Sequence, residues 1–256
     1  MVTVPTAADR ATNLGVMDAT TTHYAPPQPG PREAPAEATR VVAPRATVQK
    51  LAAELIGTFF LVFTVGTSVY SGSPYAPLAI GASLMVMVYA GGHVSGGHFN
   101  PAVTLAALVR GRIGPAESVL YWITQFVAGA LAALVARGIV TRGHIATLTL
   151  SGHGMMAAFV AELLFTFALT YVVLNVATSR DHPGNSFYGL AIGFTVMVGA
   201  FAVGAISGGV FNPAVLLGGA VMGLFAWSTS WVYLLAQILA AVAAGTTFRL
   251  LNPADR

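Results

Sequence analysis

Long apolar segments alternate with short polar breaks between residues 51 and 251. About 20 predominantly apolar residues are enough for a helix to cross a bilayer. We therefore expect six membrane-spanning helices, at about Leu51 to Tyr70, Pro77 to Gly92, Glu117 to Ala136, Met155 to Ala177, Phe187 to Val203 and Trp231 to Leu251.

Two further apolar segments are too short to cross a membrane. They run from Ala102 to Val109, where Arg110 follows, and from Ala214 to Leu224. At about 1.5 Å per residue, each covers roughly half of the ~30 Å hydrocarbon core. We expect both to be re-entrant half-helices.

The chain is an internal duplication. Residues 95–103 read SGGHFNPAV and residues 207–215 read SGGVFNPAV, at an offset of 112 residues, and flanking apolar segments match in the same register. Such self-similarity indicates two homologous halves, which we place at 49–137 and 154–251. Each half has three crossings and one half-crossing. An odd number of crossings makes the second half enter from the opposite side, as in inverted-repeat membrane proteins.

The composition of the chain indicates that its surroundings are lipid. Hydrophobic residues make up 55% of the chain and charged residues 8%, against roughly 25% charged residues in soluble domains. The chain has no cysteine, so it forms no disulfide. The sequence therefore predicts an all-α integral membrane protein in contact with lipid, with no nucleic-acid partner.

Charge and composition outside the spans predict the topology. Residues 1–48 are polar and rich in Pro, Ala and Thr, which is typical of a disordered tail, and 252–256 are expected to form a short C-terminal tail. Arginines near the N-terminus, Arg110 with Arg112, Arg180 and Arg249 fall on one side of the predicted topology; Arg137 and Arg142 are exceptions. By the positive-inside rule, both termini are expected in the cytoplasm, with the protein in the cell membrane.

The repeated Asn-Pro-Ala turns are the candidate functional site. Asparagine is a favoured N-cap and proline a favoured first helical residue, so each turn starts a half-helix whose positive dipole end points to the bilayer centre. The two turns consist of Asn100, Pro101 and Ala102, and of Asn212, Pro213 and Ala214. Asparagine amides facing an aqueous path would orient a file of water, while the two helix ends repel cations.

The chain resembles the aquaporins, or major intrinsic proteins, over about residues 50 to 251. The resemblance is carried by the paired Asn-Pro-Ala-Val turns, by AELIGTFF at 53–60 and by AEL at 161–163. It implies a six-span fold with two half-helices, a homotetramer with one pore per subunit, and passage of water or small neutral solutes.

The resemblance also implies a four-residue selectivity filter. Matched residue by residue, it is formed by Ile80, Ala200, Gly209 and Val215. Val215 stands where the family usually has an arginine, and Ile80 and Ala200 replace the aromatic residue and histidine of water-selective members. We expect a wider, more hydrophobic filter that passes water and larger uncharged molecules and excludes ions less well; a hydrophobic constriction could instead dewet and conduct poorly.

Three polar residues have competing interpretations. Glu54 and Glu162 lie within apolar spans, where ionisable residues usually mark function. The resemblance implies that they accept hydrogen bonds from the re-entrant backbone, although transporters use such carboxylates as proton carriers. His93 could line an inner vestibule and respond to pH, but a packed loop histidine is favoured.

Other function classes stay open to different degrees. A secondary active transporter also uses inverted repeats and broken helices, and a poorly conducting aquaporin-like protein is a further alternative. An enzyme is disfavoured, because the sequence holds no nucleophile-base set, metal cluster or phosphate loop. We expect no cofactor and no metal site.

Overall fold

The computed structural model describes residues 44–140 and 146–255. Six long helices in this part of the chain are apolar enough to cross a membrane, which confirms the predicted all-α membrane fold. They are α1 (Pro44–Tyr70), α2 (Ala76–Ser95), α4 (Pro115–Ile139), α5 (Gly152–Thr178), α6 (Tyr188–Ser207) and α8 (Ser230–Leu251). A 3-10 turn, η2 (Trp227–Thr229), precedes α8.

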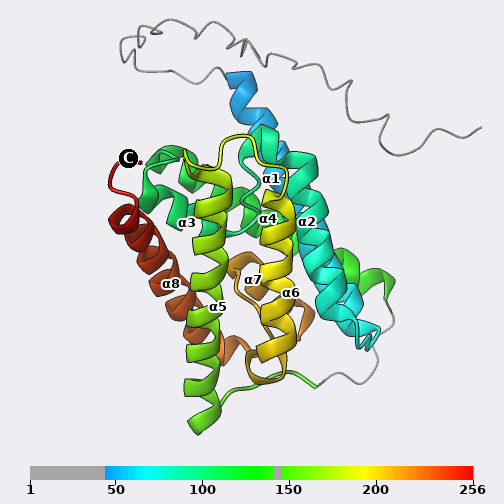
Figure 1. Ribbon diagram of the computed structural model, residues 1–256. Coiled ribbons are helices and arrows are strands. Elements are labelled where there is room, and N and C mark those ends of the chain that lie inside the picture. The colour runs from blue at the N-terminus through cyan, green and yellow to red at the C-terminus, as the bar shows by residue number, and fades with distance from the viewer. Residues whose placement is uncertain (1–43, 141–145, 256) are drawn as a thin grey trace, which may run out of the picture. The chain divides into compact units, whose positions relative to one another are not determined.

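The two short apolar segments form helices of ten residues each, α3 (Pro101–Arg110) and α7 (Pro213–Met222) (Figure 1). Their C-terminal ends lie at opposite ends of the bundle. Arg249, near the end of α8, donates to the Val109 carbonyl of α3 at 3.3 Å. Arg137, near the end of α4, donates to the Val221 carbonyl of α7 at 2.8 Å. The repeats thus place one arginine on the negative end of each half-helix.

The folded domain extends beyond both of the boundaries that the sequence predicts. Helix α1 begins at Pro44, so residues 44–48 are helical rather than part of a tail, with proline in its favoured first position. Residues 1–43 of the expected tail lie outside the described residues. At the other end, Asp255 is 5% exposed, because it pairs with arginines as described below.

The duplication holds in three dimensions with one shift of register. Most of the second repeat follows the first at the offset of 112, but Glu162 follows Glu54 by 108. The connection between α5 and α6 (179–187) is four residues longer than the one between α1 and α2 (71–75). The extra residues form a loop without counterpart in the first repeat.

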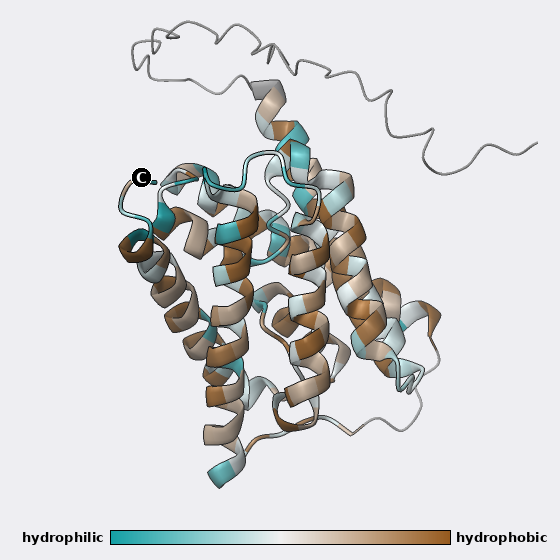
Figure 2. Ribbon diagram, viewed as in Figure 1, coloured by the Kyte–Doolittle hydropathy of each residue, from teal (hydrophilic) through white to brown (hydrophobic). Residues whose placement is uncertain are grey.

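The outer surface of the bundle is apolar. Figure 2 shows hydrophobic residues along the long helices and polar residues toward their ends. Large side chains such as Ile123, Leu134 and Phe201 are more than half exposed. Exposed apolar surface of this extent is compatible with lipid rather than water as the solvent. The chain is therefore a multi-pass membrane protein.

Half-helix α7 packs tightly on α4 at Gly129. A β-carbon added there would lie 2.7 Å from the Ala214 carbonyl oxygen, which belongs to the second Asn-Pro-Ala turn. Backbone atoms cannot yield as a flexible side chain can, so glycine is required for this approach.

We expect Gly129→Ala to destabilise the protein by about 1–3 kcal/mol, the usual cost of overpacking. Thermal unfolding in detergent measures the effect. Gly138→Ala is the matched control in the same helix, because a β-carbon there meets no atom within 4 Å; it should be neutral or slightly stabilising. Equal unfolding temperatures for the two variants would contradict the prediction.

Candidate functional site

Each half-helix starts at an asparagine that caps it. Asn100 and Asn212 have extended backbones, and their side-chain oxygens accept hydrogen bonds from the N–H groups of Ala102 (2.8 Å) and Ala214 (2.9 Å). Proline follows as the first helical residue in both cases. The local sequence therefore fixes two helix N-termini, as their N-cap chemistry predicts.

The two asparagines also join the half-helices at their tips. The amide nitrogen of Asn100 donates to the Phe211 carbonyl at 2.9 Å, and that of Asn212 donates to the Phe99 carbonyl at 2.9 Å. Each side chain thus caps its own helix and bonds to the opposite loop. The two positive helix ends meet at one place inside the bundle.

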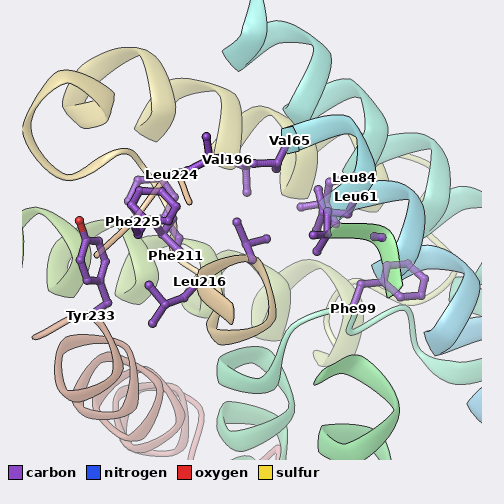
Figure 3. Close-up of a cluster of buried hydrophobic side chains, with 14 of the residues drawn as sticks. Leu61, Val65, Leu84, Phe99, Val196, Phe211, Leu216, Leu224, Phe225 and Tyr233 are labelled. Atoms are coloured by element: carbon purple, nitrogen blue, oxygen red, sulfur yellow. The ribbon is translucent and has the colours of Figure 1, made fainter. Parts of the chain in front are cut away.

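The hydrogen bonds between the two half-helix tips depend on an uncommon backbone conformation. Phe99 and Phe211 have φ of 48° and 50°, in the left-handed region that bulky residues rarely adopt. Both rings are buried, and Figure 3 shows them among the side chains of the apolar core. Packing and hydrogen bonds hold these residues in the strained conformation, which turns their carbonyls toward the opposite asparagine.

Glu54 and Glu162 organise the loops before the half-helices. Glu54 accepts four hydrogen bonds of 2.7–2.9 Å, from Ser95 Oγ, the N–H groups of His98 and Phe99, and Gln125 Nε2. Glu162 accepts the corresponding four, of 2.8–3.0 Å, from Ser207 Oγ, the N–H groups of Val210 and Phe211, and Gln237 Nε2. Both carboxylates are fully buried. Each carboxylate accepts hydrogen bonds from buried donors that would find no acceptor in the apolar surroundings.

Two buried tyrosines complete these networks. Tyr121 donates to the Ser95 carbonyl at 2.8 Å, and Tyr233 donates to the Ser207 carbonyl at 2.7 Å. Neither tyrosine was predicted as a site residue from the sequence. The two tyrosines match at the offset of 112, and this repeat could have identified them. A tyrosine hydroxyl within an apolar span needs a hydrogen-bond partner.

One cavity, of about 270 Å³, lies on the α7 side of the junction. Its walls include both asparagines and three of the four expected filter residues, Ile80, Gly209 and Val215. Ala200 does not line this cavity; it packs behind Gly209, where an added β-carbon would lie 3.0 Å from the Ala200 Cα. We call this space the outer cavity, because the topology expected from the positive-inside rule places this end of the bundle outside the cell. Most of its lining area is apolar, with aliphatic side chains from α1, α2, α5 and α6.

The segment between the two repeats contributes to the same cavity. Leu148 lies in its wall, fixed by hydrogen bonds from its N–H to the Leu224 carbonyl (2.8 Å) and from the Ala226 N–H to its own carbonyl (3.1 Å). Phe225 lines the cavity beside it. The sequence offered no signal for Leu148, since the segment has no partner in the other repeat. Arg142 lies outside the described residues.

A second cavity, of about 320 Å³, lies toward the start of α1 and the end of α3. We call it the inner chamber. It shares His98 and Val173 with the walls of the outer cavity, and its charged lining residues are Lys50, Arg112, Glu117 and Arg180. His98 contacts the Thr104 hydroxyl through Nδ1 at 3.0 Å, and its ring lies edge-on to Tyr121. The two cavities therefore adjoin at His98, beside the asparagine junction.

His93 lies in a pocket next to the inner chamber. It lines this pocket with His182, Asn185 and Tyr188, and the pocket shares Gly96 and Ala177 with the inner chamber. His93 belongs to the last turn of α2 and is not itself in the chamber wall. Within the described residues, no group of three or more His, Cys, Asp or Glu side chains could hold a metal ion.

Comparison with known proteins agrees with this architecture. The family model of the major intrinsic proteins matches residues 43–248. The chain is 37% identical over 218 residues to the putative aquaporin NIP4-1 of Arabidopsis thaliana, covering 81% of this chain and 76% of that protein. It is 37% identical over 219 residues to glycerol uptake facilitator protein-like 6 of Lactiplantibacillus plantarum, covering 81% of this chain and 100% of the relative.

A solved structure shares the fold. The aquaglyceroporin from Plasmodium falciparum superimposes with a TM-score of 0.68 at 19% identity, covering 81% of this chain and 98% of that one. Together with the family model and the relatives, this likeness accounts for the six spans and the paired half-helices. The chain therefore belongs to the major intrinsic protein family, and it is a channel protein rather than an enzyme.

Proposed function

We propose that this protein is a passive channel for water and other small uncharged solutes. The observation that carries the proposal is the junction of the two half-helices, where both asparagines lie in the wall of the outer cavity next to the inner chamber. An amide NH₂ group has two hydrogens, and each asparagine uses one for the opposite carbonyl. The other is left to donate to a passing solute. The similarity to aquaporin NIP4-1 and to glycerol uptake facilitator protein-like 6 supports the same class of cargo.

The buried carboxylates favour a channel over an ion-coupled transporter. A transporter needs an ionisable or carbonyl-rich site on the solute path that can take up and release its coupling ion. Glu54 and Glu162 each accept four hydrogen bonds and do not belong to the walls of the outer cavity or the inner chamber. Their role in this proposal is to shape the loops. Solute flux should accordingly be linear in the gradient and insensitive to ionophores.

Selectivity in this proposal comes from a wide, apolar filter formed by Ile80, Gly209 and Val215, with Ala200 behind them. No side chain of this set donates a hydrogen bond or carries charge, so the path accepts molecules by size and neutrality. We expect water to be accompanied by solutes of the size of urea and glycerol. Exclusion of cations at this point is weaker than an arginine would give.

Val215→Arg tests the proposed filter. An arginine there narrows the outer cavity and adds positive charge, so we expect the glycerol-to-water and urea-to-water permeability ratios and the cation leak all to fall. Stopped-flow swelling of proteoliposomes measures the first two, and radiotracer uptake the third. Val215→Leu adds bulk without charge and separates the two effects.

Two outcomes would count against different parts of the proposal. Unchanged permeability ratios and cation leak in Val215→Arg would show that Val215 is not at the constriction. Unmodified protein that swells vesicles no faster than protein-free lipid would refute the channel itself and favour a non-conducting member of the family.

The same proposal includes the assembly and the orientation. We propose a homotetramer in the cell membrane with both termini in the cytoplasm. The basic residues of the inner-chamber end, Arg110, Arg112, Arg180 and Arg249, support this orientation under the positive-inside rule. Chemical cross-linking in membranes and protease access to an epitope after Asp255 test the two statements.

A further inference from the structure

Positive charge predominates among the residues that line the inner chamber. Lys50, Arg112 and Arg180 line it, against one acidic lining residue, Glu117. Lys50 pairs with Glu117 at 2.7 Å, so these two charges largely cancel. The remaining positive charge comes from the arginines around Asp255, where one carboxylate pairs with Arg110, Arg112 and Arg180.

Both arginines are fixed in place by the C-terminal segment. The Asp255 carboxylate lies 3.0 Å from the Arg112 guanidinium and 3.5 Å from Nε of Arg180, whose backbone N–H also donates to it at 2.8 Å. Arg112 donates further to the Thr178 carbonyl at 2.9 Å. Two segments that border the chamber, the turn after α3 and the connection between α5 and α6, are thus held through one carboxylate.

A third arginine anchors that carboxylate. Arg110, at the end of α3, lies 2.7 Å from Asp255 with its own side chain 1% exposed, and its guanidinium stacks 4.2 Å from the centre of the Phe248 ring. The hydrogen bond from the Arg180 N–H, followed by the interactions with Arg110 and Arg112, lowers the pKa of Asp255 below its ordinary value. The carboxylate is therefore ionised at neutral pH and holds the arginines there.

The opposite end of the pathway has no comparable charge among the described residues. The filter position there is Val215, and the lining of the outer cavity includes no Lys, Arg, Asp or Glu from the described ranges. Arg137, at that end, is engaged with the Val221 carbonyl and is not part of the cavity wall. Of the two cavities, only the inner chamber is thus lined by Lys, Arg, Asp or Glu side chains from the described ranges.

We propose that the inner chamber adds a cation barrier to the positive helix ends at the asparagine junction, and that Arg112 and Arg180 are specificity-determining residues that reject cations there while neutral solutes pass. The inference rests on the proposed function, since it concerns discrimination during conduction. A cleft in which positive charge predominates repels cations and leaves neutral molecules unaffected. This barrier lies at the opposite end of the pathway from the apolar filter, which has no charged side chain to repel cations.

The test uses the full-length protein in proteoliposomes, with urea permeability and potassium permeability measured on the same preparation. In Arg112→Gln/Arg180→Gln we expect potassium permeability to rise about tenfold, from the lost electrostatic exclusion, with urea permeability within about twofold of the unmodified protein. The rise should be largest at low ionic strength, because salt screens the charges in the unmodified chamber. Arg112→Lys/Arg180→Lys keeps the charge and should keep potassium out.

A control and three outcomes decide the matter. Arg137→Gln removes an arginine from the other end and should leave potassium permeability unchanged. Potassium permeability that stays low in the double glutamine variant while urea still passes would overturn the inference and leave the proposed function standing. A rise shared by the double lysine variant would also overturn it, since shape rather than charge would be responsible. Unmodified protein that passes no urea would instead refute the proposed function.

Discussion

Replacing Glu54 by alanine is expected to abolish transport, because the substitution removes the acceptor of four buried donors at once. The N–H groups of His98 and Phe99, the Ser95 hydroxyl and the Gln125 amide would lose their partner inside an apolar bundle. Unsatisfied buried donors cost about 1–3 kcal/mol each, so the loop before α3 should not keep its conformation. Swelling assays and thermal unfolding in detergent measure the loss.

The duplication supplies an internal replicate of this experiment. Glu162→Ala removes the equivalent acceptor in the second repeat and should give the same phenotype. Asp181→Asn, in an exposed position on the connection between α5 and α6, is the control that should leave swelling and unfolding unchanged. Normal swelling rates in Glu54→Ala would show that the carboxylate is not what holds the re-entrant loop.

Asn212→Asp is expected to remove most solute flux while keeping the helix cap. Asparagine and aspartate cap helices about equally well, so the bonds from the Ala214 and Val215 N–H groups can persist. The bond to the Phe99 carbonyl cannot, since a carboxylate oxygen would replace the donating nitrogen 2.9 Å from another oxygen. We expect about 1–3 kcal/mol of destabilisation, parted half-helix tips, and a negative charge in the path that admits cations.

A matched variant shows whether the effect of Asn212→Asp comes from the junction of the half-helices or from losing any side-chain amide hydrogen bond. Asn252 donates from Nδ2 to the Phe248 carbonyl at 3.0 Å, at the end of α8. Asn252→Asp loses the same kind of bond away from the pathway and should leave swelling rates unchanged. If Asn212→Asp behaves like Asn252→Asp, the tips are joined by packing alone and the cross-bonds between them are dispensable.

The features that occur in both repeats could be predicted from the sequence, because the same local sequence pattern produces each of them twice. The six spans follow from runs of apolar residues, and α3 and α7 follow from an Asn-Pro pair before an apolar stretch too short to cross. Boundaries were less accurate: α1 starts at Pro44, before the apolar run begins, since a helix can extend beyond the hydrocarbon core.

Contacts without a repeat counterpart could not be predicted. The pairing of Asp255 with Arg110, Arg112 and Arg180 joins three segments that only the folded bundle brings together. The placement of Leu148 in the outer cavity depends on hydrogen bonds to the turn after α7. The position of His93 outside the inner chamber depends on which face of α2 meets the neighbouring helices.

The sequence by itself determined the membrane-spanning segments, the inverted duplication and the two capped half-helices, because periodic apolar composition and N-cap chemistry act within a few residues of each other. Only the tertiary structure decided that Asn100 bonds to the Phe211 carbonyl and Asn212 to the Phe99 carbonyl, and which side chains line the two cavities. Those partners lie more than a hundred residues apart, so their meeting depends on how the helices of the described bundle pack and on close approaches such as that at Gly129.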